Sequence, residues 1–313
     1  MNNFIFSLNA TLPVFIIIVL GYILMQAGIF NKEFTSVADK YVFKVALPVL
    51  LFKDIATTNI RQCFDLKFVL FCSLATISMF LIIWLFATIF IKDKTIVGAF
   101  TQASARGSAA VLGIAFVNNI YGDSGLAPLM IVAAVPFFNI LSVIILTFCS
   151  NENTGNGNIK KAFVNVLKNP IILGILAGLI YSLSGLPIPE FALKSVTYIA
   201  NTATPVALLV VGAGFEGKKA IAKLKPTIIA TLLKLVIVPL VYFPIAVSLG
   251  FRNRELVAIL VMLGAPTTVT CYIMAKNMGN DDVLSSSVVV LSTLLSSVTL
   301  TLWTFVLKSL NLI

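Results

Sequence analysis

Long apolar segments separated by short polar breaks run along the whole chain. An α-helix needs about 20 mainly apolar residues to cross the hydrocarbon core of a bilayer. Segments of about that length predict ten membrane-spanning helices, at 5–26, 37–57, 66–91, 96–119, 125–149, 166–184, 195–215, 226–250, 255–276 and 283–309. The pattern therefore predicts an all-α membrane protein.

The two halves of the chain match each other. A shift of 157 residues aligns Pro13 with Pro170, Gly21 with Gly178, Gly28 with Gly185, Glu33–Phe34 with Glu190–Phe191, and Pro48–Val49 with Pro205–Val206. We interpret this as an internal repeat within one transporter domain, 1–313, with repeat 1 at about 1–150, a Gly/Asn-rich linker at about 150–162 and repeat 2 at about 163–313. Because each repeat has an odd number of spans, the second must enter the membrane from the opposite side. Inverted repeats are typical of secondary transporters.

Composition supports a membrane location. The 313 residues are 59% hydrophobic and 11% charged, whereas soluble domains carry about 25% charged residues. The net charge of +10 comes from residues between the apolar segments, where the positive-inside bias and anionic lipid explain it. We expect membrane lipid, and no nucleic acid, among the partners.

The basic residues also predict the orientation. With the N-terminus outside, twelve lysines and arginines fall in inner loops and seven on the outer side. This favours a multi-pass protein of a bacterial inner cell membrane with both termini outside. The opening stretch, "MNNFIFSLNATLPVF", has no positively charged n-region, so we interpret it as a retained span.

Two segments interrupted by glycine or proline occupy matching places in the two repeats, which is the best sequence pointer to a transporter site. They are "SARGSAAVLG" (104–113) and "LGAPTTVTCY" (263–272). Freed backbone groups are tolerated at membrane depth only where they line a cavity or pack on protein. The candidate substrate-binding residues are Ser104, Arg106, Gly107, Ser108, Pro266, Thr267, Thr268 and Thr270, with Asn201 and Thr204 from the seventh segment. The alternative is close helix packing, which uses the same small residues.

Charges inside the apolar segments bear on the substrate. Arg106, Lys44 and Lys234 lie well within such segments, and no carboxylate is placed comparably deep. Cation-only interior charge favours an anionic substrate, with the Arg106 guanidinium holding a carboxylate. Alternatively, Arg106 braces carbonyls at a helix break or reaches the membrane surface. Lys44 and Lys234 are interpreted as interfacial or structural, and Pro48 and Pro205 are predicted to kink their helices.

Other functions find little support. The chain has no histidine and no HExxH, GxGD, paired-aspartate or Ser/His pattern at membrane depth, which argues against a membrane-embedded enzyme. The four cysteines, Cys63, Cys72, Cys149 and Cys271, show no paired spacing and predict neither a disulfide nor a metal site. We expect no cofactor, while coupling to Na⁺ or H⁺ stays open.

The chain resembles the auxin efflux carrier family, which includes bacterial permeases and the plant PIN carriers, within the superfamily of the bile acid–sodium symporters. The resemblance covers the whole length. It rests on "LPVFIIIVLGYILMQAGIF" (12–30), "ALPVLLFKDIA" (46–56), "SARGSAAVLGIAF" (104–116), "NPIILGILAGLI" (169–180), "ATPVALLVVGAGF" (203–215) and "APTTVTCYIMAKNMG" (265–279).

The resemblance implies ten helices as two inverted five-helix repeats, with the fourth and ninth spans crossing as broken helices. It also implies elevator-type alternating access, a homodimer, and a small organic anion such as malate, malonate or an auxin-like acid as substrate. Ser108, Ala110, Ala115 and Thr270 depart from the family's Asn, Gly, Pro and Asn, which leaves the anion open. The alternatives are a sodium-coupled, bile-acid-like symporter and a transporter-derived sensor or channel.

Overall fold

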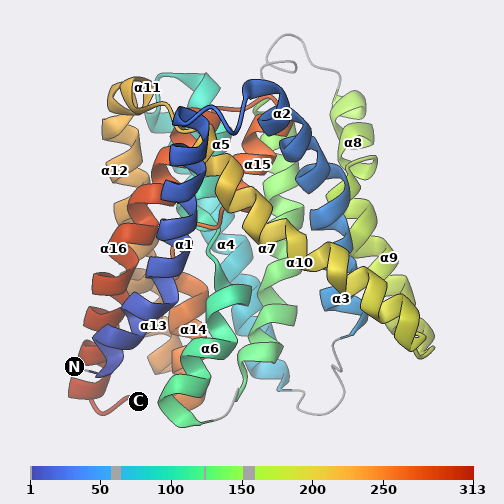
Figure 1. Ribbon diagram of the computed structural model, residues 1–313. Coiled ribbons are helices and arrows are strands. Elements are labelled where there is room, and N and C mark those ends of the chain that lie inside the picture. The colour runs from blue at the N-terminus through green and yellow to red at the C-terminus, as the bar shows by residue number, and fades with distance from the viewer. Residues whose placement is uncertain (1, 58–64, 123–124, 151–158) are drawn as a thin grey trace.

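The structure is a computed structural model that describes residues 2–57, 65–122, 125–150 and 159–313. Cys63 and most of the predicted linker lie outside the described residues. Helices make up the fold, and no β-strand occurs in the described ranges beyond one isolated bridge. The predicted all-α class is confirmed, and helical residues occupy each of the predicted apolar ranges (Figure 1).

The first half of the chain forms α1 (Asn2–Gln26), α2 (Lys32–Tyr41), η1 (Val42–Ala46), α3 (Leu47–Ala56), α4 (Leu66–Phe90), η2 (Lys94–Ile96), α5 (Val97–Ala105), α6 (Ala109–Tyr121) and α7 (Ala127–Phe148). The second half forms α8 (Ile159–Leu167), α9 (Pro170–Ser184), α10 (Glu190–Ala213), α11 (Gly217–Ala222), α12 (Leu224–Leu232), η3 (Leu233–Ile237), α13 (Val238–Ser248), α14 (Asn253–Gly264), α15 (Thr270–Asn277) and α16 (Asp282–Ser309). Five helical segments among the described residues are long and apolar enough to cross a membrane alone, namely α4, α7, α10, α12 through α13, and α16.

Two helical segments widen into π turns that a single residue separates from a following proline. The turn η1 precedes Pro48, and η3 precedes Pro239. Proline has no N–H to donate to the preceding turn, and a single π turn accommodates such a gap within a continuous helix. The predicted kink at Pro48 thus coincides with a π turn, whereas Pro205 lies inside the uninterrupted α10.

The buried apolar side chains fall into two clusters. The larger cluster draws on α4, α5, α6, α7, α13, α14 and α16. The smaller draws mainly on α1, η1, α3, α9 and α10, with contributions from α7 and α15. Within the smaller group α1 packs on α10 and α3 packs on α9, so the first two and the sixth and seventh predicted spans share one body of contacts.

Two glycines that the repeat aligns lie at close contacts of these helices. A Cβ at Gly21 of α1 would lie 2.1 Å from the backbone oxygen of Leu209 in α10, and a Cβ at Gly178 of α9 would lie 3.0 Å from that of Phe52 in α3. Backbones approach this closely only where one helix lacks a side chain. The matched glycines of the repeat therefore perform the same packing task.

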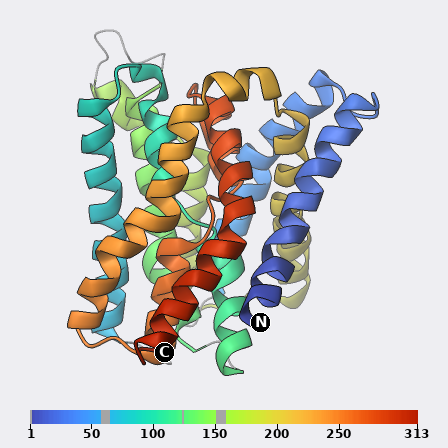
Figure 2. The same cartoon turned by 90° about the vertical axis from the view of Figure 1, so that its left-hand side faces the viewer.

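Both termini lie at one end of the molecule, and α2 and α11 lie at the other (Figures 1 and 2). The helices between these ends run roughly along one axis, as expected for a bundle that crosses a bilayer. The chain is a multi-pass helical membrane protein by length, apolarity and arrangement.

Replacing Gly21 with alanine should push α1 away from α10, because the added Cβ meets backbone that cannot rotate aside. Overpacking of this kind costs about 1–3 kcal/mol, and we expect a lower midpoint of thermal unfolding in detergent. Gly217→Ala is the control, since a Cβ there has only one atom of Phe215, 4.0 Å away, within reach. Equal midpoints for the two variants would contradict the close approach of α1 and α10.

Candidate functional site

Two helix breaks meet in the middle of the bundle. The first separates α5 from α6 at 106–108, and the second separates α14 from α15 at 265–269. Gly107 and Thr267 form an antiparallel bridge, and the Ser108 N–H donates to the Pro266 carbonyl over 2.8 Å. The structure therefore contains both interruptions found in the sequence, and the extended segments cross and satisfy one another's backbone groups.

Local sequence explains the breaks. Pro266 has no N–H and cannot continue α14 as a regular helix. Gly107 lies close to its neighbours, because a Cβ there would lie 2.8 Å from the Lys234 ammonium and would displace it. The second break is tied to its surroundings by Thr267, whose N–H donates to Ser292 Oγ and whose hydroxyl donates to the Ala103 carbonyl. The two extended segments are thus fixed by side chains as well as by each other.

Arg106 occupies the first break and is only 6% exposed. Its Nη2 donates to Asn139 Oδ1 over 2.8 Å, and its Nη1 contacts Met274 Sδ. The Asn139 amide is itself oriented, because its Nδ2 donates to the Val135 carbonyl. No carboxylate of the described residues forms an ion pair with Arg106. The guanidinium is therefore buried against neutral partners from α7 and α15.

A cavity of about 80 Å³ opens beside this guanidinium. It lies between α3, α7, α10 and the two breaks. Its polar lining consists of Asp54, Arg106, Ser108, Asn139, Thr204, Thr268 and Thr270. A second cavity of about 40 Å³ lies on the α1 and α16 side of the crossing and shares Ser108, Thr204 and Thr268 with the first. Both are far below the roughly 300 Å³ of an open ligand pocket, so the crossing is closed in this structure.

The predicted site residues divide into three groups. The larger cavity is lined by Arg106, Gly107, Ser108, Thr204, Thr268 and Thr270. Pro266 and Thr267 line only the smaller cavity. Ser104 is buried in α5, and its hydroxyl has no hydrogen-bond partner among the described residues. Asn201 is exposed on α10 and lines neither cavity.

Two residues of the larger cavity were missed by the sequence argument. Asn139 is the amide within the apolar run of α7, and an isolated amide there was a usable signal. Asp54 lies in the last turn of α3, yet it lines the same cavity as Arg106. A carboxylate from the end of a helix thus shares the cavity with the deeper cation.

Another carboxylate, Asp39, is also buried, at 2% exposure. It forms an ion pair with Lys276, which donates to the Tyr272 hydroxyl over 2.9 Å. This ion pair joins α2 to α15, the helix that follows the second break.

Lys234 lies on the opposite side of the crossing. Its side chain is fully buried, and its Nζ donates to the Leu263 carbonyl over 2.8 Å and to the Ala105 carbonyl over 3.3 Å. These carbonyls belong to the last turns of α14 and α5, where backbone oxygens have no partner within the helix and carry partial negative charge. Lys234 is therefore a structural cation at the crossing and not an interfacial one, whereas Lys44 in η1 is exposed.

Metal ligands do not gather in the described part of the chain: it holds no group of three or more Cys, Asp or Glu placed to bind an ion. Cys72, Cys149 and Cys271 are free thiols in the same residues.

Comparisons with known proteins show which family the chain belongs to. The model of a membrane transport protein family matches residues 6–304. An uncharacterized transporter of Methanothermobacter thermautotrophicus is 25% identical over 97% of this chain and 99% of its own length. The uncharacterized transporter YfdV of Escherichia coli is 26% identical over 96% and 98%, and a putative malonate transporter of Rhizobium meliloti is 25% identical over 95% of each. The chain therefore belongs to this family of membrane transporters, the auxin efflux carrier family.

Proposed function

We propose that the protein is a secondary transporter, without enzymatic activity, that moves a small mono- or dicarboxylate through the crossing of its two broken helices. The observation that carries this proposal is the buried guanidinium of Arg106, which lines a polar cavity and has neutral partners. The relative named as a putative malonate transporter points to the same class of substrate.

Charge balance favours an anion at Arg106. A cation taken out of water is costly unless a counter-charge or strong hydrogen bonds compensate it. Asn139 and Met274 supply contacts but no charge. A carboxylate entering the cavity would supply the missing charge and accept two parallel N–H bonds from the guanidinium.

The polarity of the half-helices supports the same placement. Both α6 and α15 begin at the crossing, so their N-terminal N–H groups and positive dipole ends lie near the cavity. The hydroxyls of Ser108, Thr268 and Thr270 line it as donors. The C-terminal ends of α5 and α14 are neutralised separately by Lys234. The crossing therefore offers positive potential toward the cavity.

The helix contacts support the proposed inverted repeat of ten spans. A two-fold relation between repeats requires that, if the first span packs on the seventh, the sixth packs on the second. The contacts of α1 with α10 and of α9 with α3 have this form. Among their close approaches, those of Gly21 to Leu209 and of Gly178 to Phe52 are exchanged by the same 157-residue shift.

The position of the cavity supports alternating access. Leu51 and Thr204 come from α3 and α10, whereas Arg106 and Phe138 come from α5–α6 and α7. The cavity thus lies between the two groups of helices, and its small volume requires them to separate before a dicarboxylate can enter. An elevator-type movement of the larger group against the smaller would open it to each side in turn.

Lys234 bears on the choice of coupling ion. The carbonyls that helix breaks free are the natural ligands for sodium, but those of Ala105 and Leu263 already accept from an ammonium. A sodium-coupled mechanism would need a different site in this chain.

The proposed orientation has both termini outside, which places α11 and its lysines at the inner surface. A homodimer remains part of the proposal.

Arg106→Gln should weaken carboxylate binding at least about 30-fold, since removing one member of a buried charge pair costs about 2–5 kcal/mol. Binding is measured as the thermal stabilisation of purified protein by malonate and malate, and transport as saturable uptake into liposomes. Arg254→Gln is the control, because it removes a guanidinium that faces the Tyr121 ring at 5.4 Å, away from the cavity. Equal stabilisation of both variants would make Arg106 a brace of the helix break. Stabilisation without saturable flux would favour a sensor.

Lys234→Met should destabilise the protein by on the order of 2–6 kcal/mol, because two buried carbonyls lose their donor at about 1–3 kcal/mol each. We also expect its unfolding midpoint to rise in sodium chloride relative to choline chloride, as sodium takes over the vacated carbonyls. Lys44→Met is the matched control, since Lys44 lies in the other π turn and is exposed. A stable Lys234→Met protein that ignores sodium would show that the ammonium does not hold the crossing together.

A further inference from the structure

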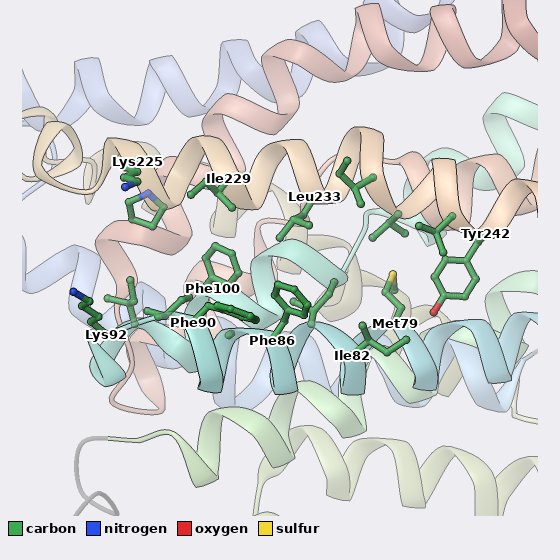
Figure 3. Close-up of a pocket in the computed structure, with 18 residues that line it drawn as sticks. Met79, Ile82, Phe86, Phe90, Lys92, Phe100, Lys225, Ile229, Leu233 and Tyr242 are labelled. Atoms are coloured by element: carbon green, nitrogen blue, oxygen red, sulfur yellow. The ribbon is translucent and has the colours of Figure 1, made fainter.

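A long apolar groove of about 640 Å³ lies on the outside of the bundle. One wall is α4, and the other is the continuous helix from α12 through η3 to α13. Figure 3 shows Phe86 and Phe90 on one side and Ile229 and Leu233 on the other, with Phe100 between them. Apart from Lys92 and Lys225 at one end and Tyr242 at the other, every side chain that lines the groove is apolar.

The groove is a true depression in the lipid-facing surface. Its walls expose large side chains, with Phe90 65% and Ile229 44% exposed, while Phe100 and Ile96 of the α5 side are buried and form the floor. Apolar walls with a closed floor suit a flexible hydrocarbon chain, because the chain fills the depression without leaving voids.

The dimensions match one membrane leaflet. From Met79 to Ile91 the α4 wall rises by about 18 Å at about 1.5 Å per residue. Half of a hydrocarbon core is about 15 Å. A chain lying in the groove would therefore reach from the membrane surface to about the bilayer centre.

Positive charge lies at only one end of the groove. Figure 3 shows Lys92 and Lys225 at the same end, on opposite walls of the groove, and neither forms an ion pair with any described residue. Their neighbours differ, because Lys94 donates to the Ile91 carbonyl and Lys223 pairs with Asp93. The two unpaired ammonium groups at the groove mouth are placed to receive an anion.

We propose that this groove binds an anionic membrane phospholipid, with one acyl chain along Phe86, Phe90, Ile229 and Leu233 and the phosphate on Lys92 and Lys225. Lys225 follows α11, at the end of the molecule opposite the termini (Figure 1). The positive-inside prediction makes that end cytoplasmic, and anionic lipids are enriched in that leaflet. The proposal does not depend on the transported substrate.

The groove also reaches the crossing through a single turn of helix. In η3, Leu233 lines the groove while the next residue, Lys234, holds the carbonyls of the two half-helices. A bound acyl chain would pack against the same π turn. We therefore expect the lipid to stabilise the folded protein as well as to bind it.

The test places a reporter in the groove. Phe86→Trp is titrated in detergent micelles with phosphatidylglycerol or phosphatidylcholine carrying brominated acyl chains, and the fluorescence of the parent protein, with its two native tryptophans, is subtracted. Phe305→Trp is the control, since Phe305 is 67% exposed on α16 and does not line the groove. We expect saturable quenching at position 86 that prefers phosphatidylglycerol, and no headgroup preference at position 305.

Charge removal tests the headgroup contact. Lys92→Gln/Lys225→Gln should raise the half-quenching concentration of brominated phosphatidylglycerol about 30-fold, from about fivefold for each lysine near the membrane surface. Lys32→Gln/Lys218→Gln removes the same charge from exposed positions at the same end and should leave it unchanged. The thermal stabilisation of the unlabelled protein by phosphatidylglycerol should follow the same order.

Three results would overturn the proposal. The first is equal quenching of position 86 by the two lipids. The second is an undiminished preference for phosphatidylglycerol after Lys92→Gln/Lys225→Gln. The third is the absence of quenching at position 86 by either lipid. The last result would mean that a second copy of the chain covers the groove.

Discussion

Backbone polar groups without water are the constraint on which this structure depends. Two helices stop inside the membrane, and every N–H and C=O freed there must find a partner within the protein. The extended segments meet this need by bonding to each other, from Ser108 to Pro266, and by taking an ammonium group at the carbonyl ends of α5 and α14. Gly107 completes the arrangement because a Cβ at that position would displace the ammonium.

These backbone contacts leave negative and positive helix ends on different sides of the crossing. Lys234 offsets the negative helix ends, so the positive ends of α6 and α15 and the Arg106 guanidinium are not cancelled. Asn139 and Met274 hold the guanidinium in place and add no charge. Asp54 on the same cavity adds a carboxylate, but it pairs with Lys53 over 3.6 Å and not with the guanidinium. The proposed anion site is therefore a consequence of how the breaks are stabilised.

Lysine has opposite uses at the two faces of the same helix. Lys234 is fully buried and bonded to backbone, whereas Lys225, nine residues earlier, stands at the mouth of an apolar groove. The π turn η3 connects the two environments, since Leu233 lines the groove and the next residue, Lys234, bonds to the crossing. Packing of lipid on one side and backbone bonding on the other thus act on one short segment.

The sequence by itself determined the all-helical membrane class, the apolar segments, the positions of both breaks and the presence of Arg106 at the first of them. These features follow from local chemistry, because hydrophobic length, proline and glycine act on the residues next to them. Only the tertiary structure decided which polar groups share the cavity. The packing of α3 and α7 brings Asp54 to the cavity and Asn139 to Arg106, and Lys234 reaches the crossing from a helix more than 100 residues further along the chain. Such contacts depend on how distant helices face each other, which the hydropathy of a segment does not encode.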